Sequence, residues 1–238
     1  MTDYNIPAGL IPDDDVARLR RLEQFEILNT APETDFDKIA LLAAEIFETR
    51  HGYISFINKE DVFIKAGLDG FGEETRPRMN SLSALSILKQ EPTVYHDIFE
   101  FPEPAEGQFL SGAENLSFFA AAPIITADGF ALGTISVTDD QPHPGVSDRQ
   151  LKMLQLLAGI VMEKLETRLF NRKLSADCNN RMHRLVHDLK NPVTSISLYA
   201  QLLGNRELSP EKVFSMAAKI EGSARVIENK LNGLLEKN

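Results

Sequence analysis

The sequence predicts an α+β protein in which one antiparallel sheet with flanking helices is followed by a long helix and a helical hairpin. Two changes in hydrophobic period support this prediction. Apolar residues follow helical spacing before residue 48, form short β-rich runs between residues 53 and 138, and return to helical spacing from Ser147 almost to the end. Short strands separated by turn residues favour antiparallel neighbours, and helices then cover the sheet.

Two helices open the chain. Pro12 and the acidic residues 13–15 suit a helix start, because carboxylates favour the positive end of the helix dipole. Residues 30–33 start a second helix. The expected buried face of the first helix carries Val16, Leu19, Leu22 and Phe25, and that of the second carries Phe36, Ile39, Leu42, Ala43, Ile46 and Phe47.

The β-rich middle of the chain divides into short elements. Strands are expected at 53–57 and 62–65, a loop at 67–80, a short helix at 81–90, a strand at 93–97 and a loop at 101–114. The clearest hairpin joins 117–126 to 130–138 through Ala127-Asp128-Gly129, since glycine tolerates the positive φ of a tight turn. Pro123 cannot donate to the ladder, which predicts a sheet edge or a bulge there.

From Ser147 onward the pattern predicts one long helix and then a second, shorter one. Gly204 ends the long helix, and Ser209 caps the next, with Pro210 at its first position. Because a two-helix hairpin cannot bury two apolar seams alone, we expect a homodimer in which two hairpins form a four-helix bundle. The first seam is Met182, Leu185, Leu189, Val193, Ile196, Ala200 and Leu203, and the second is Val213, Ala217, Ile220, Ala224, Ile227, Leu231 and Leu234.

The first 165 residues resemble a GAF domain in element order and length. The late hairpin, FFAAAPIITADGFALGTISV at 118–137, is similar to the one typical of that family. The opening over residues 22–37, with Leu22, Phe25, Leu28 and the run Thr30-Ala-Pro-Glu33, is similar to the front of GAF domains attached to bacterial histidine kinases. The resemblance implies a sensor domain at 1–165, a coiled-coil connector at 166–180 and a helical hairpin at 181–238.

The run His187-Asp-Leu-Lys-Asn-Pro-Val193 is the candidate chemical site. Neutral imidazole has an unprotonated nitrogen that can carry a phosphoryl group, and Asp188 can accept or orient the other ring proton. Asn191 lies one turn later on the same helical face and could hold a water or the phosphoryl group. Pro192 should bend the helix just beyond the site. An ordinary exposed histidine is the alternative interpretation of His187.

This run resembles the phosphoacceptor box of histidine-kinase dimerisation domains, with Lys190 at the family's basic position. The resemblance implies that His187 exchanges a phosphoryl group with a response-regulator aspartate. No Gly-rich loop followed by Lys-Ser/Thr is present, and Asp69-Gly-Phe-Gly72 is expected to be an ordinary loop. We therefore expect no autonomous kinase activity and no cofactor bound by this chain. Mg²⁺ and ATP would come only through a partner, such as an ATP-binding kinase domain in trans, or through a missing domain.

The composition limits the classes of partner and the cellular location that we expect. A net charge of −10 argues against nucleic acid, which needs clustered Lys and Arg. Cys178 is the single cysteine, and neither a signal peptide nor a transmembrane segment is visible, so a cytoplasmic location without membrane contact is expected. Two other functions stay open: a dimeric adaptor without phosphotransfer, and a small-molecule sensor acting by protein binding. Fold analogy alone suggests a pocket of Tyr53, Phe63, Ser83, Tyr95 and Phe119.

Overall fold

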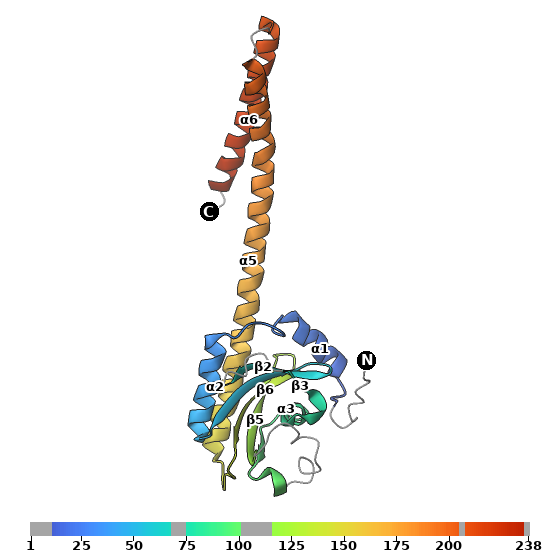
Figure 1. The fold of residues 1–238 in the computed structure, drawn as a ribbon, viewed down its shortest axis with the longest axis vertical. Helices are drawn as coiled ribbons and strands as arrows, with labels where there is room; N and C mark the ends of the chain where they lie inside the picture. The colour runs from blue at the N-terminus through green and yellow to red at the C-terminus, as the bar shows by residue number, and fades with distance from the viewer. Residues whose placement is uncertain (1–10, 68–74, 101–115, 205–207, 236–238) are drawn as a thin grey trace. The chain divides into compact units, whose positions relative to one another are not determined.

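The computed structural model describes residues 11–67, 75–100, 116–204 and 208–235. Two compact units divide the chain, Met1–Phe170 and Asn171–Asn238. Helix α5, Asp148–Leu203, contributes its first turns to one unit and its last turns to the other, as Figure 1 shows. No helix among the described residues is both long and apolar enough to cross a membrane.

The first unit is built on one sheet, and the predicted α+β class is confirmed. Among the described residues the sheet has six strands in the order β3-β2-β1-β6-β5-β4, and every neighbouring pair is antiparallel. The β5–β6 hairpin turns where predicted, with Gly129 at φ 93°. The strands are β1 His51–Ile57, β2 Asp61–Gly67, β3 Thr75–Pro77, β4 Thr93–Tyr95, β5 Phe118–Ile125 and β6 Ala131–Asp139.

Pairing of β1 with β6 joins the two hairpins into one sheet, and a glycine permits it. Gly133 lies opposite Phe56, and a Cβ on Gly133 would stand 2.0 Å from the Ser55 carbonyl oxygen. Pro123 lies in the part of β5 that β4 does not cover, next to a register shift between Ile124 and Ile125. Both features agree with the predicted edge or bulge.

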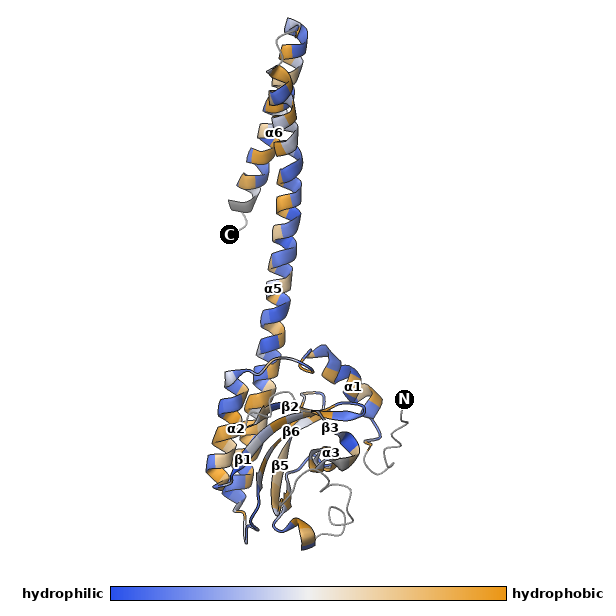
Figure 2. Cartoon of the chain, viewed as in Figure 1, coloured by the Kyte–Doolittle hydropathy of each residue, from blue (hydrophilic) through white to orange (hydrophobic). Residues whose placement is uncertain are grey.

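Helices α1, Asp15–Gln24, and α2, Thr34–Phe47, pack with the first turns of α5 on one face of the sheet, and α3, Leu82–Ser86, packs on the other (Figure 1). Apolar segments run along the strands and the start of α5 (Figure 2). The largest core cluster combines Leu22, Phe36, Phe47, Phe56, Phe118, Ile135, Leu154, Val161 and Leu165 with their neighbours.

The prediction that Val16 and Leu42 lie in the core was wrong, because both side chains are exposed. The inner face of α1 instead carries Asp15 and Arg18. Arg18 donates to the Ile57 carbonyl at the end of β1, and Asp15 accepts from Arg18. On α2, the small side chains of Ala40 and Ala44 point inward, since the helix lies close to β1. A Cβ on Gly52 would come within 2.1 Å of the Ala40 carbonyl oxygen.

Other elements differ from the sequence prediction in extent. The predicted loop at 67–80 contains β3 and the 3-10 helix η2, Arg78–Asn80, because the edge of β2 offers partners from Asp61 to Phe63. The helix expected at 81–90 is the single turn α3, and a second 3-10 helix, η3, spans Ile98–Glu100. The loop predicted at 101–114 lies outside the described residues.

The second unit is a two-helix hairpin. Helix α5 continues through Pro192 and ends at Leu203, immediately before Gly204. Helix α6 spans Pro210–Leu235, and its first turn closes with a hydrogen bond from the Val213 N–H to the Ser209 carbonyl. These boundaries confirm the predicted stop at Gly204 and the predicted start at Ser209 and Pro210.

Candidate functional site

His187 lies on α5 in the hairpin unit, and its side chain is 75% exposed. Its Nδ1 atom is 3.7 Å from Oδ1 of Asp188, the next residue, whose side chain is 49% exposed. Because Nδ1 faces the carboxylate, Nε2 is the ring nitrogen left for a phosphorus atom to approach from solvent. The structure therefore places an exposed His187 ring beside the Asp188 carboxylate.

Asp188 has a second partner that the sequence analysis missed. Lys230, on α6, contacts Oδ2 of Asp188 through its Nζ atom. The Lys230 hydrogen bond and charge hold the pKa of Asp188 below its ordinary value, with a smaller contribution from His187. Lys230 follows His187 by more than forty residues, so no local spacing could have linked them. Only the register in which α5 and α6 pack brings the two residues close together.

The other predicted site residues lie near His187 in sequence. Within the part of the chain that the structure describes, no hydrogen bond or ion pair joins the side chains of Lys190 or Asn191 to His187. Hydroxyl groups one turn later donate to their carbonyls, from Thr194 to Lys190 at 2.8 Å and from Ser195 to Asn191 at 3.1 Å. Pro192 is half-buried in the hairpin and cannot donate to the Asp188 carbonyl.

A single hairpin covers only part of its apolar seams. In the part that the structure describes, no side chain after Phe170 is buried. Half-buried seam members are Leu185, Leu189, Ile196, Leu203, Ile220 and Ile227, whereas Met182, Val193, Ala200, Val213, Ala217, Ala224 and Leu231 are exposed. The side chain of Leu234 lies outside the described set. Each helix thus keeps an uncovered apolar stripe beside its covered one.

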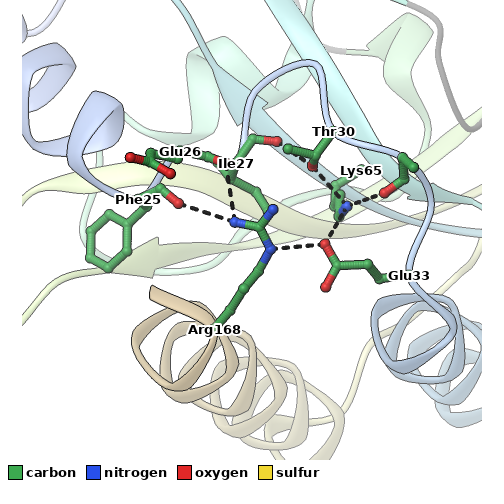
Figure 3. A network of polar contacts seen from close by, with 8 residues as sticks. Phe25, Glu26, Ile27, Thr30, Glu33, Lys65 and Arg168 are labelled. Carbon is green, nitrogen blue, oxygen red and sulfur yellow. Dashed lines mark hydrogen bonds and ion pairs between the residues drawn. The ribbon is translucent and has the colours of Figure 1, made fainter. Parts of the chain in front are cut away.

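In the first unit, a polar network ties α5 to the segment between α1 and α2 (Figure 3). Nε of Arg168 donates to Oε1 of Glu33 at 2.9 Å, and Nη1 donates to the Phe25 and Glu26 carbonyl oxygens at 3.2 and 3.1 Å. Arg168 therefore holds both ends of the α1–α2 segment. It lies on the last part of α5 that belongs to the first unit.

The same glutamate reaches the sheet through Lys65 of β2, as Figure 3 shows. Nζ of Lys65 lies 2.8 Å from Oε1 of Glu33 and donates to Thr30 Oγ1 at 2.9 Å and to the Ala31 carbonyl at 2.5 Å. Burial lowers the pKa of Lys65, and Glu33 opposes that shift. Burial would raise the pKa of Glu33, but Lys65 and Arg168 together lower it. Glu33 thus bridges a sheet cation and a helix cation.

The pocket suggested by fold analogy does not form as one set. Phe63 joins the core on the face covered by α2 and α5. Tyr95 and Phe119 join a separate cluster with Leu82 of α3, on the other face. Alternation along a strand places neighbouring side chains on opposite faces, so Phe63 cannot line a cavity with Tyr95 and Phe119.

Comparison with known proteins assigns both units. Residues 31–165 match the GAF domain family, and residues 179–237 match the His Kinase A phospho-acceptor domain. These matches leave no room within the 238 residues for an ATP-binding domain.

A cyclic di-GMP phosphodiesterase of Pseudomonas aeruginosa is 27% identical over 156 residues, which are 66% of this chain and 26% of that protein. The chain therefore spans about a quarter of that relative.

Two solved GAF domains resemble this chain more distantly. One, from an Acinetobacter phosphoenolpyruvate-protein phosphotransferase, has 16% identity, a TM-score of 0.48, and coverage of 66% of this chain and 95% of its own. The other, the blue-light absorbing form of PixJ from Thermosynechococcus elongatus, has 14% identity, a TM-score of 0.48, and coverage of 69% and 96%. The chain belongs to the GAF domain family and carries a His Kinase A phospho-acceptor domain behind its GAF domain.

Proposed function

We propose that this chain is a two-component signalling protein in which His187 exchanges a phosphoryl group with an aspartate of a response regulator. The observation that carries the proposal is the exposed imidazole with Nδ1 3.7 Å from the Asp188 carboxylate, inside the segment that matches the phospho-acceptor domain. An exposed site is needed because the phosphoryl donor must approach in line with the attacking nitrogen.

The chemistry follows from the two ring nitrogens. Nε2 of His187 attacks phosphorus while the bond from phosphorus to its previous carrier breaks. The ring then carries an extra positive charge, which the Asp188 carboxylate stabilises by accepting the Nδ1 proton. In the reverse direction the aspartate of the response regulator attacks and Asp188 returns the proton. Mg²⁺ and ATP belong to the partner domains.

The function includes a homodimer. Both hairpin helices keep exposed apolar residues next to half-buried ones, including Val193 on α5 and Leu231 on α6. Burial of one Val or Leu side chain stabilises by roughly 1.5–3 kcal/mol. A second hairpin with the same stripes supplies the missing cover and produces a four-helix bundle. His187 lies off the predicted seam and stays available in that arrangement.

The GAF domain provides the control in this proposal. Helix α5 is continuous from the sensor core, where Leu154 and Leu165 are buried, to the phospho-acceptor segment. Arg168 ties the same helix to the α1–α2 segment. A change in the sensor domain that shifts this segment therefore acts directly on the helix that carries His187.

Phosphoryl acceptance by the purified chain tests the proposal. Phosphoramidate supplies the phosphoryl group without a kinase, and acid-labile phosphohistidine is quantified by ³¹P NMR and by a phosphate-affinity gel. We expect labelling of the wild type, loss of labelling in His187→Gln, and retained labelling in His183→Gln, an exposed histidine one turn earlier. The dimer mass from light scattering should be the same in all three.

Transfer is measured next. The labelled chain is mixed with receiver domains and Mg²⁺, and loss of phosphohistidine with gain of acyl phosphate is the expected result. Equal labelling of the wild type and His187→Gln would contradict the assignment of His187. A dimer that accepts no phosphoryl group from phosphoramidate or from phosphorylated receiver domains would favour the adaptor function instead.

A further inference from the structure

We infer that Lys230 is a positioning residue for phosphoryl transfer, because it binds the far oxygen of the Asp188 carboxylate and orients the near oxygen toward His187. The inference rests on the proposed function of His187. The three groups form a chain across the hairpin, from Nζ of Lys230 to Oδ2 of Asp188 and from Oδ1 of Asp188 to Nδ1 of His187. Asp188 is the only member that touches both others among the described contacts.

The position of Lys230 on α6 explains what it adds. Asp188 and His187 are neighbours on α5, and their side chains leave the helix about 100° apart, so the helix alone does not direct the carboxylate at the ring. The ammonium group of Lys230, on the facing helix α6, supplies that direction. Lys230 is half-buried beside the covered seam residue Ile227, and its aliphatic stem can pack there while its ammonium group reaches Asp188.

This contact also acts on the charge of the carboxylate, which is ionised at neutral pH and which Lys230 stabilises further. The lysine hydrogen bond and charge favour the ionised form, which accepts a proton but cannot donate one. An ionised, oriented carboxylate keeps the proton of neutral His187 on Nδ1 and leaves the Nε2 lone pair free. During transfer, the phosphorus–nitrogen bond forms at Nε2, the bond to the leaving group breaks, and the Nδ1 proton moves to Asp188.

The test compares initial rates of phosphohistidine formation with phosphoramidate, from which ammonia departs as the new bond forms. Because the contact is partly exposed, Lys230→Met should slow the reaction roughly two- to fivefold. Lys230→Arg should stay close to the wild-type rate, since a guanidinium group also donates to a carboxylate. The matched control is Lys212→Met, an exposed lysine at the start of the same helix, which should leave the rate unchanged.

A double-mutant cycle shows whether Lys230 acts through Asp188. The rate of the Asp188→Asn, Lys230→Met double variant should equal that of Asp188→Asn alone. An additive loss, a Lys230→Met rate equal to wild type, or a Lys230→Arg rate as low as that of Lys230→Met would each overturn the inference. If the wild type is labelled and His187→Gln is not, any of these results overturns the role of Lys230 alone. A wild type that takes no phosphoryl group overturns the proposed function as well.

Discussion

Replacing Asp15 with asparagine should lower the free energy of unfolding of the first unit by about 3–5 kcal/mol, the usual cost of breaking a buried ionic cluster from one side. The carboxylate lies between two guanidinium groups, Arg18 and Arg78, each 1% exposed. Its Oδ1 accepts from Arg18 Nε at 2.7 Å and from Arg78 Nη2 at 2.9 Å, and its Oδ2 accepts from Arg78 Nη1 at 2.9 Å. Asparagine has the same shape but no charge, and its amide group places a donor against donors.

The same cluster predicts a loss of stability in acid. Burial raises the pKa of Asp15, but the hydrogen bonds from Arg78 and Arg18 outweigh it and hold the pKa below the ordinary value. A carboxyl group with a lower pKa in the folded state stabilises the fold fully above its unfolded-state pKa of about 3.9, and this contribution disappears as the pH falls through the folded-state value. The wild type should therefore lose stability below about pH 4. The Asp15→Asn variant should not show this part of the loss of stability in acid.

Urea denaturation followed by tyrosine fluorescence measures both effects, because Tyr53 and Tyr95 lie in the sheet. Asp13→Asn is the matched control: Asp13 belongs to the same acidic run but is exposed, and its removal should change stability by less than about 0.5 kcal/mol. An Asp15→Asn variant within about 0.5 kcal/mol of the wild type would refute the argument that this carboxylate compensates the two arginines.

Two further changes test the fold and the link to α5. Gly133→Ala should lower the free energy of unfolding by about 1–3 kcal/mol or more, since its Cβ would stand 2.0 Å from the Ser55 carbonyl oxygen. Gly159→Ala, with open space around it in α5, should raise the free energy of unfolding by roughly 0.5–1 kcal/mol in the same denaturation assay. A neutral Gly133→Ala would contradict the close approach of β1 and β6. Arg168→Ala should speed amide hydrogen exchange in residues 25–33 and leave β6 unchanged, with exposed Arg20→Ala as control. Unaltered exchange in that segment would show that Arg168 does not order it.

Local sequence signals predicted the elements whose boundaries are set locally. Gly129 marked the β5–β6 turn because a positive φ is required there, and Gly204, Ser209 and Pro210 marked the break between the two long helices. The α+β class and the helical hairpin followed from periodicity, which is a property of a single segment. The GAF and phospho-acceptor resemblances rest on the same segments and are confirmed.

Features that depend on distant partners were not predictable in this way. Strand β3 exists because the edge of β2 is open to it, and the sequence at 75–77 reads as a loop. Arg18 points inward against hydrophobic expectation because it meets the Ile57 carbonyl, thirty-nine residues later. Lys230 reaches Asp188 only because α6 packs against α5 in this register. In each case the deciding partner lies far along the chain.

Charge is used in two different ways in the two units. In the first unit, Asp15, Arg18 and Arg78 are enclosed, so breaking their contacts would leave charge without water. The intact contacts hold α1 to the β1–β2 turn. At the candidate site, His187, Asp188 and Lys230 are all at least 39% exposed, so solvent can replace any one contact at small cost. If His187 accepts a phosphoryl group as proposed, that group brings negative charge, which attracts cations. A weak, exposed pair can then orient Asp188 before transfer and release Lys230 when the charge arrives, which a buried pair could not do.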